Sequence, residues 1–133
     1  MPVRVEFIDE AVADLAGYRE TALFPQLLAK LVRLEEVGKQ AGLPLGKGLT
    51  HWRKIVVGDR AWRIIFTTNP EESIATVWVI GDRDDAACYD LALRRVEALP
   101  KDQVHNASLA GVMYQLSQRQ RGAQRKTRSK KQG

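Results

Sequence analysis

Side chains from the middle of the chain have the types that a metal-free RNA-cleaving site would use. They are Arg63, Arg83, Tyr89 and one of the neighbours Arg53 and Lys54. Such cleavage needs a base for the 2′-hydroxyl, positive charge beside the phosphorane and a proton for the departing 5′-oxygen. Guanidinium groups match phosphate with paired donors, and charge arranged in advance for the transition state is usually the largest rate term. A lysine or tyrosine can act as the general base when nearby arginines lower its pKa, and tyrosine can also stack on a nucleobase.

The same residues also have a plainer interpretation. Single arginines and tyrosines on strands and helices mostly serve as surface charge or packing. Arg83 could pair with Asp84 or Asp85, and exposed ion pairs of that kind add little net stability. The residue types alone therefore leave both catalysis and ordinary surface charge open.

Three consecutive strands are predicted to position these side chains, at about residues 52–57, 61–67 and 74–80. The first two strands join through Gly58-Asp59, which is a strong hairpin signal, and the last two join through a polar turn at 69–72. Two hairpins in series make an antiparallel meander.

The period of two in a strand assigns side chains to the faces of this sheet. The apolar residues of the second strand share one face, which should pack on helices, and they are Trp62, Ile64 and Phe66. Arg63 then points to the opposite face. In the first strand neither face is wholly apolar, so the pattern does not decide whether Arg53 or Lys54 points the same way as Arg63.

The remaining elements complete an α+β fold. Residues 3–7 alternate as a strand, and helical spacing of apolar residues follows at 10–20 and at roughly 25–41. A last helix runs from Asp84 or Asp85 to Leu99. We therefore expect an N-terminal strand, a helix pair, a three-stranded antiparallel meander that completes a four-stranded sheet, and a C-terminal helix. The helix pair should cover one face, and the other face should stay partly open for a site.

The chain divides into three regions by composition. Residues 1–99 should form one domain, residues 100–118 a helical appendage, and residues 119–133 a basic, disordered tail. The tail holds seven Lys or Arg residues and no acid, which leaves 14 basic against 16 acidic residues before it. Such a tail is either an arm for nucleic acid or a solvated segment that aids solubility. On the first interpretation Arg125 and Lys126 would bind RNA, as would Arg53 and Arg60 in the domain.

Several classes of protein are disfavoured by the sequence. The chain has one cysteine, Cys88, and its two histidines, His51 and His105, lack metal-ligand spacing. We therefore expect no metal and no cofactor. No apolar stretch of 18 residues and no signal peptide is present, so a cytoplasmic protein without membrane contact is the expectation.

At the residues named above, the sequence resembles the RelE/ParE superfamily of bacterial toxins from toxin–antitoxin modules. The resemblance covers roughly residues 3–99 and rests on the order of short motifs. These are an aromatic-basic strand start, a glycine turn, an aromatic-arginine pair, a strand ending in Gly-x-Arg, and a later tyrosine: Trp52-Arg53-Lys54, Gly58-Asp59, Trp62-Arg63, Gly81-Asp82-Arg83 and Tyr89. The resemblance implies a RelE-like microbial RNase fold.

For function, the RelE branch implies a type II toxin that is a ribosome-dependent mRNA endonuclease and inhibits translation. Arg63 would stabilise the transition state, and Arg83 would hold the scissile phosphate or assist the leaving group. Lys54 or Arg53 would supply charge or basicity, and Tyr89 would stack on the message or transfer protons. One departure is that Val56 stands where RelE has a second lysine on this strand.

The resemblance also implies partners and competing functions. A cognate antitoxin, mRNA and the ribosome are the expected partners. A ParE-like toxin would instead block DNA gyrase by binding, without catalysis, although such a binder does not need the set of Arg63, Arg83 and Tyr89. A third possibility is a non-toxic nucleic-acid binder that uses the basic tail.

Overall fold

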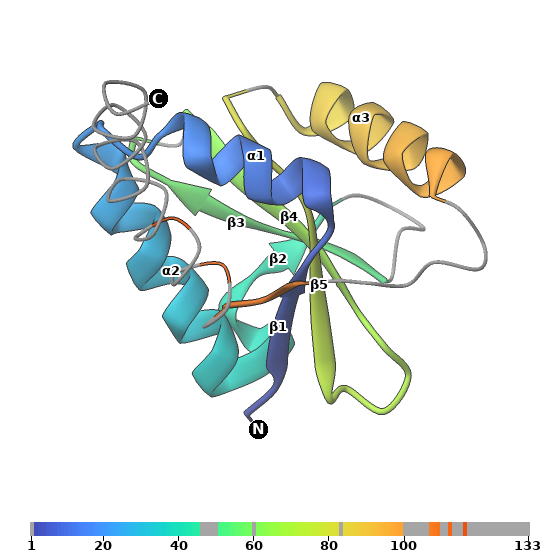
Figure 1. The fold of residues 1–133 in the computed structure, drawn as a ribbon. Coiled ribbons are helices and arrows are strands. Elements are labelled where there is room, and N and C mark those ends of the chain that lie inside the picture. The colour runs from blue at the N-terminus through green and yellow to red at the C-terminus, as the bar shows by residue number, and fades with distance from the viewer. Residues whose placement is uncertain are drawn as a thin grey trace, which may run out of the picture.

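The computed structural model of the chain describes residues 2–45, 51–59, 61–82, 84–99, 107–109, 112 and 116. The predicted helices and strands follow one another in the predicted order (Figure 1). The elements are β1 (Arg4–Phe7), α1 (Asp9–Gly17), α2 (Leu23–Val37), the 3₁₀ helix η1 (Gly38–Ala41), β2 (Leu43–Pro44), β3 (Trp52–Val57), β4 (Trp62–Thr68), β5 (Ile74–Gly81), α3 (Asp85–Ala98) and β6 (Ala107–Ser108).

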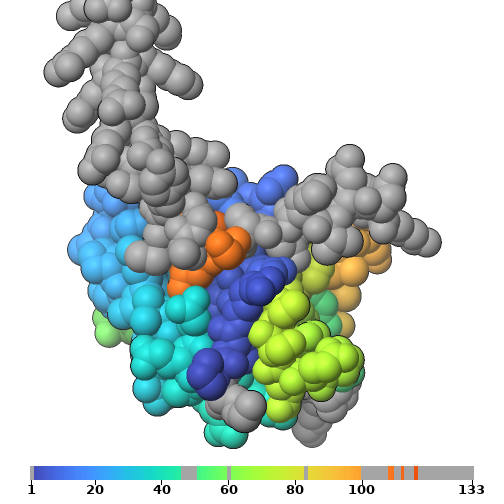
Figure 2. Space-filling model, turned by 60° about the horizontal axis from the view of Figure 1, so that its bottom comes forward, coloured from blue at the N-terminus to red at the C-terminus, as the bar shows by residue number. Residues whose placement is uncertain are grey.

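The strands form one mixed sheet in the order β2-β3-β4-β5-β1-β6. Strands β3, β4 and β5 are the predicted antiparallel meander, and β1 joins β5 in parallel. The α+β class is confirmed, but the sheet formed by the described residues has two strands more than the predicted four. The additional strands, β2 and β6, have two residues each and lie at the two edges of the sheet. A strand of two residues is too short to show the apolar–polar alternation that marks a strand in a sequence. Figure 2 shows β1 (dark blue) between the described C-terminal segment (orange) and the β4–β5 region (yellow-green).

Helices α1 and α2 cover one face of the sheet and enclose the main core. Their buried residues recur at helical spacing, as in Leu27, Leu31 and Leu34 of α2, which are fully buried. They pack with strand residues that include Ile64 and Phe66, also fully buried. Each such side chain contributes roughly 1.5–3 kcal/mol by leaving water. This core is what holds the meander flat against the helix pair.

Helix α3 packs on the other face of the sheet, apart from the α1–α2 pair (Figure 1). Cys88 and Ala92 are one turn apart on α3 and fully buried, and they contact Ile65 and Val79. Small side chains on the helix let it approach the strands closely. The expectation that this face stays partly open was therefore wrong over the middle of the sheet, because the C-terminal helix covers it.

A β-bulge in β5 changes the pairing register of this strand with β4. The register of β4 and β5 shifts between Ile65, which pairs with Val79, and Phe66, which pairs with Val77, so Trp78 is the extra residue. Its indole Nε1 donates to Oγ1 of Thr67 at 2.8 Å. The β3–β4 ladder, by contrast, runs without a break from Trp52 to Val57.

Asp14 and Arg95 form hydrogen bonds to backbone groups of β5 beyond the end of its pairing with β1. The pairing of β1 with β5 ends at Val77, which leaves backbone groups further along β5 in need of partners. The carboxylate of Asp14 on α1 accepts from the N–H of Ile80 at 3.0 Å, and Nη1 of Arg95 on α3 donates to the carbonyl of Trp78 at 2.8 Å. Arg95 also donates to both oxygens of Asp14, at 2.6 and 3.1 Å. The pair therefore ties α1, β5 and α3 together.

Part of the predicted appendage packs on the domain. Strand β6 pairs with β1, and Leu109, Val112 and Leu116 are buried in the main core. The division of the chain at residue 100 stays a prediction. The basic tail at 119–133 lies outside the described residues.

Two glycine substitutions should have opposite effects on stability. A Cβ at Gly42 would lie 2.7 Å from the Phe66 ring and 2.8 Å from the backbone oxygen of Lys54, whereas a Cβ at Gly17 meets nothing within 4 Å. We expect Gly42→Ala to cost about 1–3 kcal/mol through overpacking. Gly17→Ala, at the end of α1, should gain about 0.5–1 kcal/mol by removing a helix glycine. Urea unfolding measures both, and equal stabilities would contradict the described packing around Gly42.

Removal of the Arg95 guanidinium should destabilise the domain. Arg95→Met leaves the Asp14 carboxylate and the Trp78 carbonyl without their charged donor, and both side chains of the pair are mostly buried. We expect a loss of about 2 kcal/mol in the free energy of unfolding, since hydrogen bonds to charged groups are worth roughly 1.5–3 kcal/mol. Arg94→Met, one residue away and exposed, is the matched control and should change stability by less than about 0.5 kcal/mol. Similar thermal unfolding of the two variants would show that the pair contributes nothing.

Candidate functional site

A cluster of opposite charges lies between the sheet and the start of α3. In the β3–β4 ladder Lys54 pairs with Ile65 and Val56 pairs with Arg63, so Lys54 and Arg63 are diagonal neighbours on one face. Nζ of Lys54 donates to Oδ2 of Asp85, and Nε of Arg63 donates to Oδ1 of the same residue. One carboxylate therefore bridges two cations that come from adjacent strands.

The electrostatics of this cluster favour an ionised Asp85. Burial opposes the charged form of the carboxyl, but the hydrogen bonds from Lys54 and Arg63 more than offset it, and the pKa of Asp85 lies below its ordinary value. The side chains of Lys54 and Arg63 are 19% and 18% exposed, whereas that of Asp85 is 36% exposed. The carboxylate is thus the solvent-facing member of the cluster.

Lys54, and not Arg53, shares a face with Arg63. Arg53 instead points to the side of η1, where its Nε donates to the carbonyl of Lys39 at 2.9 Å and its Nη2 donates to that of Gly42 at 2.8 Å. These bonds hold the segment before β2 against β3. The choice that the sequence left open is therefore decided by alternation along an unbroken strand, with Ile55 and Val57 directed into the main core.

An aromatic group adjoins the charged cluster. Tyr89 lies four residues after Asp85 on α3, which places the two side chains on the same face of the helix. The ring of Tyr89 meets that of Trp52 edge-on, with ring centroids 5.6 Å apart. The ring centroids of Trp52 and Trp78 are 5.9 Å apart. Trp52 precedes Lys54 by two residues on the same face of β3. The site thus combines two cations, a carboxylate and half-buried aromatic rings.

Four of the candidate residues lie outside the described part of the chain: Arg60, Arg83, Arg125 and Lys126. The convergence of Arg63 and Arg83 therefore stays a prediction. Of the described residues before and after position 83, Gly81 is the ladder partner of Arg63, and Asp84 caps α3 by accepting from the N–H of Ala87 at 2.8 Å.

Sequence reasoning missed Asp85, Trp52 and Trp78 as members of this site. Asp85 was considered only as a partner for Arg83, and among the described residues it binds Lys54 and Arg63. The signal that could have found it is its spacing of four residues from Tyr89, which puts both on the helix face that packs on the sheet. The position of Trp78 depends on the bulge in β5, which leaves no mark in the residue pattern.

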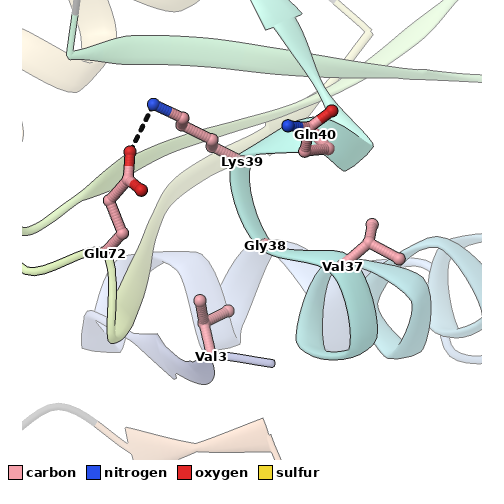
Figure 3. A pocket seen from close by; sticks show the side chains of 6 residues that line it. All are labelled: Val3, Val37, Gly38, Lys39, Gln40 and Glu72. Carbon is pink, nitrogen blue, oxygen red and sulfur yellow. Dashed lines mark ion pairs between the residues drawn. The ribbon is translucent and has the colours of Figure 1, made fainter. Parts of the chain in front are cut away.

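Small cavities among the described residues also lie away from this site. One of about 120 Å³ is lined by Val3, Val37, Gly38, Lys39, Gln40 and Glu72, and the Lys39–Glu72 ion pair spans it (Figure 3). A neighbouring one of about 230 Å³ is bordered by Lys39, His51 and Arg53, among others. Neither is lined by Lys54, Arg63 or Tyr89.

Within the described residues no group of three or more His, Cys, Asp or Glu side chains could hold a metal ion, and no described helix is long and apolar enough to cross a membrane.

Comparison with known proteins identifies the fold. No protein-family model matches the chain, and no curated protein matches its sequence. A double arginine-to-alanine mutant of the E. coli toxin RelE, solved in the free state, is similar in structure with a TM-score of 0.59 and 21% identity, over 72% of this chain and 99% of that one. The RelBE2 toxin–antitoxin complex of Mycobacterium tuberculosis gives a TM-score of 0.46 and 23% identity, over 62% of this chain and all of its own. The chain therefore has a RelE-like fold, as the order of its motifs predicted.

Proposed function

We propose that this protein is the toxin of a type II toxin–antitoxin module and acts as a metal-independent, ribosome-dependent mRNA endonuclease in the cytoplasm. The observation that carries the proposal is the placement of Lys54 and Arg63 on one face of a RelE-like sheet, with Tyr89 beside them. Cations held on paired strands are fixed in advance of substrate binding, which is the condition for electrostatic catalysis of phosphoryl chemistry.

The places of Lys54, Arg63 and Tyr89 support their proposed roles, and the role of Arg83 comes from the family resemblance alone. In the proposed reaction the 2′-oxygen attacks phosphorus, the bond to the 5′-oxygen breaks, and a 2′,3′-cyclic phosphate and a free 5′-hydroxyl remain. Arg63 and Lys54 would bear the negative charge on the phosphorane oxygens. Tyr89 would stack on a base or carry a proton, and Arg83 would hold the scissile phosphate. Trp52 supports the Tyr89 ring and thereby its orientation.

The proposed partners follow from this activity. They are mRNA, the ribosome that presents it and a cognate antitoxin that masks the toxin until it is needed. Arg53 contributes through structure in this proposal, because its guanidinium is bound to the carbonyls of Lys39 and Gly42. The basic tail, with Arg125 and Lys126, would add sequence-independent contacts to phosphates.

Two observations favour the non-catalytic alternative, a ParE-like inhibitor of DNA gyrase. Both cations of the candidate site are engaged by Asp85, and Val56 occupies the position of a second strand lysine. A surface with fewer available charges suits binding better than phosphoryl transfer. The experiment below separates the two functions.

Translation in vitro with a defined message tests the proposal. We expect cleavage within the codon at the ribosomal A site, and Arg63→Ala should lower the rate about 10²–10³-fold because it removes charge from the transition state. Lys54→Ala and Arg83→Ala should also lower it. Arg33→Ala on the exposed side of α2 is the matched control and should cleave normally. An intact message together with inhibited gyrase supercoiling would establish the alternative.

A further inference from the structure

The Asp85 carboxylate has the features of a bound phosphate. Its two oxygens each accept a charge-assisted hydrogen bond from a different cation, Lys54 on β3 and Arg63 on β4. The two non-bridging oxygens of a phosphodiester present the same pattern, a pair of equivalent anionic acceptors on one atom. The protein thus supplies, from its own helix, an anion of the kind that the two cations would otherwise bind.

We propose that Asp85 is an internal competitor that occupies the phosphate position of the site, so that RNA must displace it to bind. This inference deepens the proposed function, because it concerns the same site and the same class of ligand. Asp85 would then set how strongly the site holds an RNA phosphate, without taking part in the reaction itself.

The arrangement permits Asp85 to leave without disturbing the fold. It is the first residue of α3 and the most exposed member of the cluster. The helix is held independently of it: Asp84 caps the first turn, Cys88 and Ala92 pack on the sheet, and Arg95 anchors the last turn. A change of the Asp85 rotamer therefore suffices to break its hydrogen bonds to Lys54 and Arg63, while both cations stay in place on the strands.

This competition would act as a filter on substrates. A free RNA that offers only one phosphate must replace a carboxylate that is already tethered at the site. Its apparent affinity is therefore its intrinsic affinity multiplied by the fraction of protein molecules in which Asp85 has left the site. A message that is held by additional contacts has the binding energy to displace Asp85. The carboxylate would therefore favour RNA presented on a larger assembly over free RNA.

The test is a binding measurement that needs neither ribosome nor cleavage. A 2′-O-methyl dinucleotide is titrated into the full chain, and arginine Nε–H signals are followed by NMR. Asp85→Asn removes the competing charge, and we expect it to bind the dinucleotide about tenfold more tightly than the wild type. Asp90→Asn makes the same charge change at an exposed position of α3, where it should alter affinity no more than about twofold.

Equal or weaker binding by Asp85→Asn than by the wild type would overturn the inference, because Asp85 would then organise the cations and not block them. Should that variant fail to fold, the carboxyl carbon of Asp85 is followed by ¹³C NMR in the wild-type chain. Displacement requires its chemical shift to change in step with saturation, and an unchanged shift refutes it. Tighter binding by Asp85→Asn in a protein that cleaves no message would uphold the inference and refute the proposed function alone.

Discussion

The alternation of side chains along β4 is the constraint on which both the core and the candidate site depend. Ile64 and Phe66 point into the main core with α1 and α2, which leaves Arg63 and Ile65 on the side of α3. Because β4 is hydrogen-bonded to β3 and β5 on its two sides, it cannot slip by one residue without exchanging these two sets. The burial of two large apolar side chains thereby determines where a guanidinium points.

Helix α3 completes the candidate functional site on the second face of the sheet. Its small buried residues allow the helix to lie close to the strands, and its first turn then brings an acid and a tyrosine beside two cations. Arg95 secures the far end through Asp14 and the Trp78 carbonyl. The chemistry-bearing residues at the N-terminal end of α3 are therefore positioned by contacts further along the same helix.

The elements that carry a strong period could be predicted from the sequence. The three strands of the meander begin and end within one residue of the expected positions, and α3 begins at Asp85 as one of two expected residues. The face of Arg63 followed from the apolar residues on either side of it, whereas that of Lys54 required the ladder itself, because neither face of its strand is wholly apolar.

What could not be predicted depends on contacts between residues far apart in the chain. Asp85 is 31 residues from Lys54 and 22 from Arg63, and no local pattern records which cation a carboxylate will meet. The bulge that places Trp78, and the two-residue edge strands, likewise arise from the docking of whole elements. Position 83 lies outside the described residues, so the geometric part of the catalytic hypothesis rests on Lys54, Arg63 and Tyr89.

The way the sheet ends has a consequence for how other molecules can attach. Within the described residues, the outermost strands are two residues long, and one of them contains Pro44, which has no N–H to offer. Where β1 does not pair with β5, the side chains of Asp14 and Arg95 form hydrogen bonds to the backbone of β5. Long unpaired edges invite chain-to-chain pairing and aggregation. The two edge strands themselves therefore offer little backbone for such growth, and a partner that attaches to them must do so mainly through side chains.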